Sequence, residues 1–288
     1  MLPTPNELEK YLGELKPCII CNGNNLEPWA KLDYLEAKKC TSCGMISINP
    51  HLNNIGLTKL YENYFSYRLD DKDLFEKRKI MYEIDRNWIT RFIDKGTILD
   101  VGCSGGQFLN TFDPKKWDRQ GVEIDKNAAE HAKKEYGISV KVGYFPEIKF
   151  EEKFDLVMMR GVIEHFSDPI SVLKKCAEVL KPGGYLFITA TPVGDSFAFY
   201  VYREKWHLFT PPAHLHFFSV DLLTRVLNKF GLSLIDRHYQ YEETPYANSK
   251  EDFAKIQNDI ILKSLEKQIT YSQSFPGSIM TAVWKKKT

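Results

Sequence analysis

The chain lacks the segments that would place it in a membrane or mark it for export. Its N-terminus, MLPTPNELEK, has no basic stretch followed by an apolar run, which a secretory signal peptide requires. No apolar run elsewhere approaches the roughly 20 residues of a membrane-spanning helix. We therefore expect a cytoplasmic protein without a membrane span.

An excess of charge of either sign is also absent. The 288 residues contain 39 Lys and Arg against 38 Asp and Glu, so no basic field indicates binding to nucleic acid or to an acidic membrane surface. Hydrophobic residues make up 43% of the chain, which is sufficient for a large buried core. The composition predicts a globular protein.

Cysteine is scarce, and four of the six cysteines form two pairs near the N-terminus. Cys18 and Cys21 are one Cys-x-x-Cys pair, Cys40 and Cys43 are the other, and eighteen residues separate the pairs. This spacing is typical of a zinc ribbon, in which four thiolates complete a tetrahedral site and leave no position for a substrate. We predict a structural zinc site, with four metal-free buried cysteines as the alternative.

The sequence divides into three regions. Residues 1–54 are expected to form a tail and the ribbon, residues 55–95 a helical connector or cap, and residues 96–288 a core with a lid insertion near 192–218. The connector contains an aromatic stretch, LYENYFSYR, which either packs between ribbon and core or caps a ligand cleft. Apolar side chains then recur at every fourth position and predict one buried helix face: Ile80, Ile84, Trp88 and Phe92.

Glycine is concentrated in GTILDVGCSGGQFLNTF, residues 96–112. We interpret residues 98–101 as a short buried strand and the glycines as a turn that feeds a short helix near Gln107. Neither the G-x-G-x-x-G fingerprint nor the G-x-x-x-x-G-K-[ST] phosphate loop is matched. A second strand, residues 120–124, includes Glu123, whose carboxylate is placed to accept hydrogen bonds from ribose hydroxyls.

Two further motifs follow the second strand. FDLVMMRGVIEHFSDP is an apolar strand that breaks at Arg160, and LKPGGYLFITATP ends a helix and continues as a strand. Strands that alternate with helices predict a parallel sheet. The expected strands are residues 98–101, 120–124, 139–142, 154–159 and 185–191.

Taken in order, these four motifs resemble those of class I S-adenosylmethionine-dependent methyltransferases. VIEHFSDP and PPAHLHFFSVDLLTRVLNKFGL are most similar to the branch that acts on small molecules, which includes ubiquinone-type O-methyltransferases and enzymes of nucleotide sugars and natural products. The ribbon resembles the zinc-binding segment of sugar C-methyltransferases. The resemblance implies an α/β fold with a doubly wound, mostly parallel sheet of seven strands, in which GSIMTAVWKK is the antiparallel seventh.

The resemblance also implies S-adenosylmethionine as the cofactor and suggests its site. The glycine turn and the end of the first strand would line the methionine end, and Glu123 would hold the ribose. The predicted cofactor residues are Asp100, Gly102, Cys103, Ser104, Gly105, Phe108, Glu123, Ile124, Tyr144 and Arg160.

Methyl transfer requires alignment of the acceptor and, for a hydroxyl, removal of its proton. His165, His214 and His216 are the candidate bases, because histidine titrates close to neutral pH. Glu164 is adjacent to His165 and either orients it or forms a structural ion pair with it. His214 and His216 are two residues apart, so an extended segment would point both to one face. We expect O-methyl transfer, and the sequence leaves C- and N-transfer open.

Two predictions concern the last third of the chain. Four aromatic residues either form a lid over the acceptor or simply pack together: Tyr200, Tyr202, Trp206 and Phe209. A tail helix is expected to pack on the core through Phe253, Ile256, Ile260, Leu265 and Ile269.

A small-molecule acceptor is predicted because the ribbon offers little positive charge. Its four lysines are partly balanced by three acids, and no Asp/Asn-Pro-Pro-aromatic run follows the fourth strand, which disfavours methylation of nucleic-acid base amines. The alternatives are an RNA methyltransferase with the ribbon as its RNA-binding module, and a non-catalytic cofactor-binding partner protein. The sequence leaves monomer and homodimer open.

Overall fold

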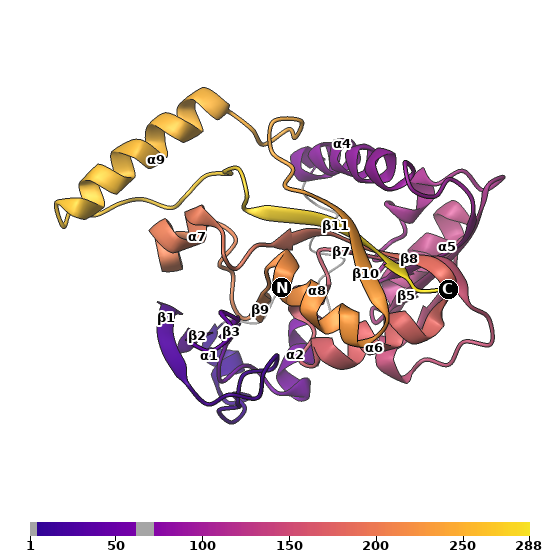
Figure 1. Ribbon diagram of the computed structural model, residues 1–288, viewed down its shortest axis with the longest axis horizontal. Helices are drawn as coiled ribbons and strands as arrows, with labels where there is room; N and C mark the ends of the chain where they lie inside the picture. The colour runs from indigo at the N-terminus through magenta and orange to yellow at the C-terminus, as the bar shows by residue number, and fades with distance from the viewer. Residues whose placement is uncertain (1–4, 62–71) are drawn as a thin grey trace.

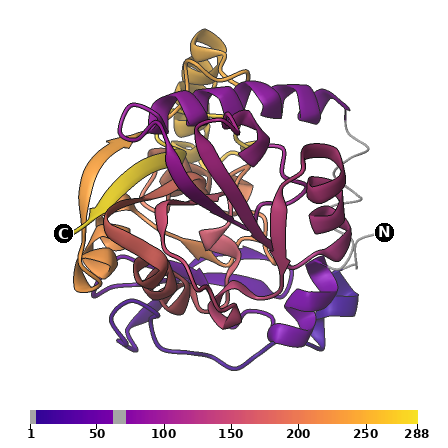
Figure 2. The same ribbon diagram turned by 90° about the vertical axis from the view of Figure 1, so that its right-hand side faces the viewer.

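The computed structural model describes residues 5–61 and 72–288. The aromatic stretch LYENYFSYR lies almost entirely outside the described residues. Two sheets organise the chain, a large one of seven strands and a small one of four. In Figures 1 and 2 the small sheet lies at the bottom of the molecule, and helix α4 (Lys72–Ile89) crosses the top.

The seven-stranded sheet has the order β10-β11-β8-β7-β4-β5-β6. Strands β6, β5, β4, β7 and β8 are parallel, and β11 runs antiparallel between β8 and β10. This confirms the predicted fold, a mostly parallel sheet with an antiparallel seventh strand. The strands are β4 Gly96–Val101, β5 Trp117–Glu123, β6 Ser139–Val142, β7 Phe154–Arg160, β8 Leu180–Pro192, β10 Leu232–His238 and β11 Ile279–Lys286.

Helices cover both faces of the large sheet. Buried residues of α6 (Pro169–Val179) and α8 (Val220–Lys229) pack on one face, and Ile89 of α4 and Ala132 of α5 (Lys126–Tyr136) pack on the other. The helix starts follow local chemistry, because Asp125, Asp168 and Ser219 each accept a backbone N–H of the first turn. The sheet is therefore doubly wound.

The small sheet joins the ribbon to the core. Its strands β1 (Leu26–Leu32), β2 (Leu35–Cys40) and β3 (Ile46–Ile48) come from the ribbon, and β9 (His216–Phe217) comes from the segment after β8. Ribbon side chains share a hydrophobic cluster with α7 (Phe197–Tyr202). The ribbon and the core therefore share one sheet and one hydrophobic cluster.

The remaining elements are short, apart from one. They are α1 Pro5–Glu9, α2 Asn54–Tyr61, α9 Ser249–Ser264 and the 3₁₀ helices η1 Leu109–Thr111, η2 Phe145–Glu147, η3 Ile163–His165 and η4 Arg203–Lys205. In Figure 1, α9 extends away from the sheet at the upper left. Among the described helices, none combines the length and the apolar character needed to cross a membrane.

Helix α4 buries the predicted face only in part. Trp88 and Phe92 are partly buried and pack against the core, as expected, but Ile80 is 50% exposed. The fully buried positions lie one residue further along, at Met81, Asp85 and Ile89, and they include a charged residue. That residue, Asp85, is invisible to a pattern based on apolar side chains.

Two other expectations differ from the structure, and for most of the aromatic group the packing alternative holds. The glycine turn leads only to the three-residue 3₁₀ helix η1. Of the tail residues on α9, Ile256 is buried, but Phe253 and Ile260 are exposed, so the helix packs by a narrow contact. Three of the four aromatics proposed for a lid are buried in the shared cluster: Tyr202, Trp206 and Phe209.

Gly194 is required where the small sheet meets the large one. Its backbone N–H donates to the Phe218 carbonyl at 2.7 Å, and an added Cβ would lie 2.1 Å from the Phe217 carbonyl oxygen. The Phe217 carbonyl belongs to the backbone, so it cannot move aside as a flexible side chain could. Gly194→Ala is therefore expected to lower the free energy of unfolding by about 3 kcal/mol or more, measured by urea denaturation. Lys250→Ala, an exposed change on α9, is the control and is expected to stay within about 0.5 kcal/mol. Equal stability of the two variants would contradict the prediction.

Candidate active site and metal centre

A cavity of about 620 Å³ opens at the carboxyl ends of β4, β5, β7 and β8. This edge of a parallel sheet is where ligands of doubly wound folds bind. All predicted cofactor residues except Gly105 line the cavity: Asp100, Gly102, Cys103, Ser104, Phe108, Glu123, Ile124, Tyr144 and Arg160. The carbonyl of Gly105 instead lies 3.1 Å from Nδ1 of His131 on α5.

The glycine turn lets the backbone come close to the cavity. Gly102 has a φ of 73°, and a Cβ there would lie 2.8 Å from the Val162 side chain. The turn is tied to the end of β5, because the Glu123 carboxylate accepts the backbone N–H of Ser104 at 2.8 Å, that of Ile124 at 2.7 Å and that of Asp125 at 3.0 Å. Burial raises the pKa of Glu123. A carboxylate can accept about four hydrogen bonds, so capacity for a ribose hydroxyl remains after these three backbone bonds are counted.

Asp100 carries a buried acceptor that the protein leaves unsatisfied. Its side chain is almost fully buried, and Oδ1 has no hydrogen-bond partner among the described residues. Burial and the charge of Glu123 raise the pKa of Asp100 well above its ordinary value, and Arg160 opposes the shift. An orphaned oxygen in a cavity wall is costly unless a ligand donor satisfies it. A cationic amine of a bound ligand fits this position.

Arg160 presents a fixed positive charge at the same end of the cavity. Its Nε donates to Oδ2 of Asp85 at 2.7 Å. The guanidinium carbon lies 4.7 Å from the ring centroid of Tyr82 and 5.8 Å from that of Phe108. These contacts hold the guanidinium plane beside the glycine turn, where it can bind a carboxylate.

His165 and His214 lie together and form a second group of side chains in this cavity. Their ring centroids are 5.0 Å apart, and both residues line the cavity. Nδ1 of His165 is 2.8 Å from the Ala213 carbonyl, and Nδ1 of His214 is 2.7 Å from the Leu208 carbonyl. A carbonyl only accepts, so in each neutral ring Nδ1 carries the hydrogen and Nε2 is the acceptor nitrogen.

Glu164 completes this group from the same turn as His165. It is buried, its Oε2 accepts the Thr191 hydroxyl at 3.1 Å, and its Oε1 is 3.9 Å from Nε2 of His165. One ligand atom from each of Glu164, His165 and His214 lies within 4.8 Å of the others. Three acceptors this close favour a positive species between them, and either a transferred proton or a divalent cation would meet that need.

The structure separates His216 from the other two histidines. His214 follows the turn at residues 211–213 and lines the large cavity, whereas His216 begins β9 and lines a different one, so the expectation that both point to one face was wrong. His216 is 2% exposed and lines a second cavity of about 530 Å³ between ribbon and core, where its Nδ1 is 3.0 Å from the Ser47 hydroxyl. Burial lowers its pKa to about 3. It is therefore not brought to the acceptor end of the large cavity.

The four ribbon cysteines converge as the spacing predicted. The sulfur atoms of Cys18 and Cys43 are 3.5 Å apart, as are those of Cys21 and Cys40, and all four lie within 4.8 Å of one another. Zn–S bonds of 2.3 Å in a tetrahedron place sulfurs about 3.8 Å apart. The cluster fits a zinc ion. The pairing of β1 with β2, which lie between the two cysteine pairs in the sequence, brings those pairs together.

The sequence pattern of a family described as a methyltransferase domain matches residues 73–237, more than half of the chain. The chain belongs to this methyltransferase family. The methyltransferase is 28% identical to a ubiquinone biosynthesis O-methyltransferase of Cereibacter sphaeroides, over 74% of this chain and 87% of the relative. It is 29% identical to an uncharacterized protein of Methanocaldococcus jannaschii, over 56% of this chain and 76% of that protein.

Solved structures share the fold of this methyltransferase. One is the N-methyltransferase NodS of Bradyrhizobium japonicum in complex with S-adenosyl-L-homocysteine, with a TM-score of 0.52, 14% identity and coverage of 79% of this chain and 98% of that one. Another belongs to the complex between the Haloferax volcanii Trm112 methyltransferase activator and a putative methyltransferase, with a TM-score of 0.58, 15% identity and coverage of 79% and 99%. The predicted class of enzyme, an S-adenosylmethionine-dependent methyltransferase, is confirmed.

Sequence reasoning missed one residue of the site and left another open. Asp85 on α4 holds Arg160, and it could have been found as a charged residue midway between Met81 and Ile89 on one helix face. Tyr61, at the end of α2, belongs to the aromatic stretch LYENYFSYR, for which a cap over a ligand cleft was one of the two alternatives. It lines the cavity, and its hydroxyl is 2.9 Å from Nδ1 of His165.

Proposed function

We propose that this methyltransferase transfers the methyl group of S-adenosylmethionine to a hydroxyl of a small-molecule acceptor. The observation that carries the proposal is one cavity lined by two chemically different groups of side chains. Asp100, Arg160 and Glu123 supply charges suited to the cofactor, and His165 and His214 supply proton acceptors.

The cofactor fits the groups at its end in charge and in shape. The α-ammonium of its methionine part would satisfy the orphaned Oδ1 of Asp100, and its carboxylate would face Arg160. The ribose hydroxyls would donate to Glu123, and Ile124 and Tyr144 would border the adenine. The absent Cβ of Gly102 leaves the backbone close to the ligand.

The acceptor end would align the nucleophile and take its proton. The bound cofactor supplies the electrophilic methyl group and the leaving thioether. An acceptor oxygen forms the new O–C bond as the C–S bond breaks, and its proton passes to Nε2 of His165 or His214. The backbone carbonyls at both Nδ1 atoms fix the rings, and Glu164 would stabilise the imidazolium formed at His165.

A small-molecule acceptor is supported by the enclosed position of the two histidines and by the weak charge of the ribbon. On the ribbon, Lys38 pairs with Glu36 at 3.6 Å and Lys39 lies over the Trp29 ring at 4.5 Å, so neither is arranged in a basic strip. The Cereibacter sphaeroides relative is named for ubiquinone biosynthesis, a small-molecule pathway. An intact glycine turn and an orphaned Asp100 favour a catalyst over a silent partner protein. A cytoplasmic location stays a prediction.

The ribbon cysteines are proposed to hold a structural zinc ion. A closed set of four thiolates supplies folding energy and performs no chemistry. Through β3 and β9 the zinc would support the segment that carries His214. The domain limits at residues 54 and 95 stay proposals, as does a role for residues 192–218 in acceptor binding.

The proposed function is tested first by ligand binding and by the fate of the methyl group. Calorimetry is expected to show one S-adenosylhomocysteine site per chain. With methyl-labelled cofactor and a cell extract split into RNA and small-molecule fractions, label is expected in small molecules. Label confined to RNA would replace this acceptor class with the alternative, and no binding of the cofactor product would refute the proposal.

The histidine base is tested with His165→Gln and His214→Gln once an acceptor is known. Loss of the base is expected to lower kcat by about 10²- to 10⁴-fold in at least one variant, with S-adenosylhomocysteine affinity nearly unchanged. His238→Gln is the control, because His238 is half-exposed and lies outside the cavity. Assays with and without added Mg²⁺ separate a proton acceptor from a cation site. Full activity of both cavity variants would refute the role.

The zinc proposal predicts one zinc ion per chain by elemental analysis. Cys40→Ser is expected to lose the metal, lower Tm and abolish methyl transfer, while S-adenosylhomocysteine binding to the remaining folded protein persists. Ser42→Ala lies in the same knuckle but provides no sulfur, and it is the matched control that should keep zinc and activity. Zinc-free wild-type protein, or a Cys40→Ser variant of unchanged stability, would contradict the proposal.

A further inference from the structure

We infer that Asp85 is a positioning residue that fixes Arg160 for the carboxylate at the methionine end of the cofactor. The inference rests on the proposed function and assigns a role to a residue outside all four sequence motifs. Asp85 does not line the cavity, whereas Arg160 does. Any influence of Asp85 on the cofactor must therefore act through Arg160.

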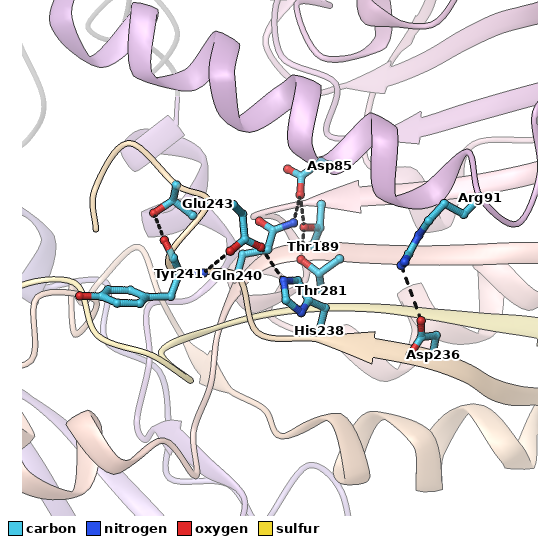
Figure 3. A network of polar contacts seen from close by, with 10 residues as sticks. Asp85, Arg91, Thr189, Asp236, His238, Gln240, Tyr241, Glu243 and Thr281 are labelled. Carbon is cyan, nitrogen blue, oxygen red and sulfur yellow. Dashed lines mark hydrogen bonds and ion pairs between the residues drawn. The ribbon is translucent and has the colours of Figure 1, made fainter. Parts of the chain in front are cut away.

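Asp85 is a fully buried carboxylate with three donors. It is 0% exposed, and it accepts Nε of Arg160 at 2.7 Å, the Thr189 hydroxyl at 2.7 Å and Nε2 of Gln240 at 2.8 Å. Figure 3 shows Asp85 pointing from α4 toward Thr189 on β8 and Gln240 beyond β10. Thr189 is in turn 2.7 Å from the Thr281 hydroxyl of β11. The donors that fix the carboxylate thus come from β7, from β8 and from the segment after β10.

This arrangement directs one edge of the guanidinium into the cavity. Among the described residues, Arg160 forms its side-chain hydrogen bond with Asp85 through Nε, which leaves the two Nη groups for a ligand. Tyr82 and Phe108 restrict rotation of the plane. Guanidinium groups bind carboxylates through two parallel N–H donors, and that geometry requires the plane to be held in advance.

The charges of the site match those of the amino-acid part of the cofactor. Asp100 faces the cavity with an unsatisfied acceptor suited to the α-ammonium, and Arg160 faces it with donors suited to the α-carboxylate. Without Asp85, Arg160 would lose the carboxylate bonded to its Nε and, with it, the contact that fixes its direction. A purely structural ion pair would instead affect the stability of the fold and every ligand of the cavity alike.

Two ligands distinguish these roles. S-adenosylhomocysteine has the amino-acid part, and 5′-methylthioadenosine lacks it but retains the adenosine and the sulfur. In Asp85→Asn the Kd for S-adenosylhomocysteine is expected to rise about 10- to 100-fold, because a charge-assisted contact is lost. The Kd for 5′-methylthioadenosine is expected to change less than about 3-fold, and Arg160→Met should reproduce both results. Calorimetry measures each value.

The controls separate binding from folding. Asp155→Asn removes a carboxylate that bonds Lys181 at 2.7 Å on the same sheet but outside the cavity, and it should leave both Kd values unchanged. If Asp85→Asn does not fold, Thr189→Val removes one donor to Asp85 and should weaken S-adenosylhomocysteine alone by a few-fold. Equal weakening of both ligands, or no weakening of either, would overturn the inference while the proposed function stands. Failure of the wild-type protein to bind either ligand would overturn both.

Discussion

The backbone of Leu215 is the link on which the acceptor end of the site depends. Its N–H donates to the Glu164 carbonyl at 2.9 Å, and its carbonyl accepts the N–H of Ile48 at 2.8 Å. Leu215 therefore joins the turn after β7, the ribbon strand β3 and the segment with His214 in one place. Because backbone hydrogen bonds in a buried region tolerate little displacement, these three segments form one structural unit. The ribbon is therefore part of the scaffold that positions Glu164 and His214.

The cofactor end is organised by buried charge instead of by backbone pairing. Asp85, on α4, accepts hydrogen bonds from three donors, whereas Oδ1 of Asp100, on β4, has no hydrogen-bond partner among the described residues. Asp85 supports Arg160 by accepting a hydrogen bond from it, and Asp100 lines the same cavity as Arg160. Unsatisfied polar groups inside proteins concentrate at functional sites, where a ligand replaces the missing partner. The contrast between the two aspartates indicates that the ligand binds beside Asp100, which lines the cavity, and not beside Asp85.

The sequence was most informative where structure follows from local chemistry. The buried strands, the glycine turn, the position of Glu123 and the paired cysteines all depend on residues close together in the chain, and the structure brings them to the expected places. The frame of α4 was missed because Asp85 interrupts an apolar face for an electrostatic reason. His216 was misplaced because its direction is set by pairing of β9 with a ribbon strand about 170 residues earlier, which no local pattern encodes.

The position of β11 has a consequence for how the chain is made. This strand, residues 279–286, lies between β8 and β10, and Thr281 belongs to the group around Thr189. During synthesis from the N-terminus, β8 emerges about ninety residues before β11 and leaves the edge of a hydrophobic sheet without its neighbour. Until the later strand inserts, Thr189 also lacks one of its hydrogen-bond partners. The edge of β8 therefore stays unpaired until β11 has been made and has inserted.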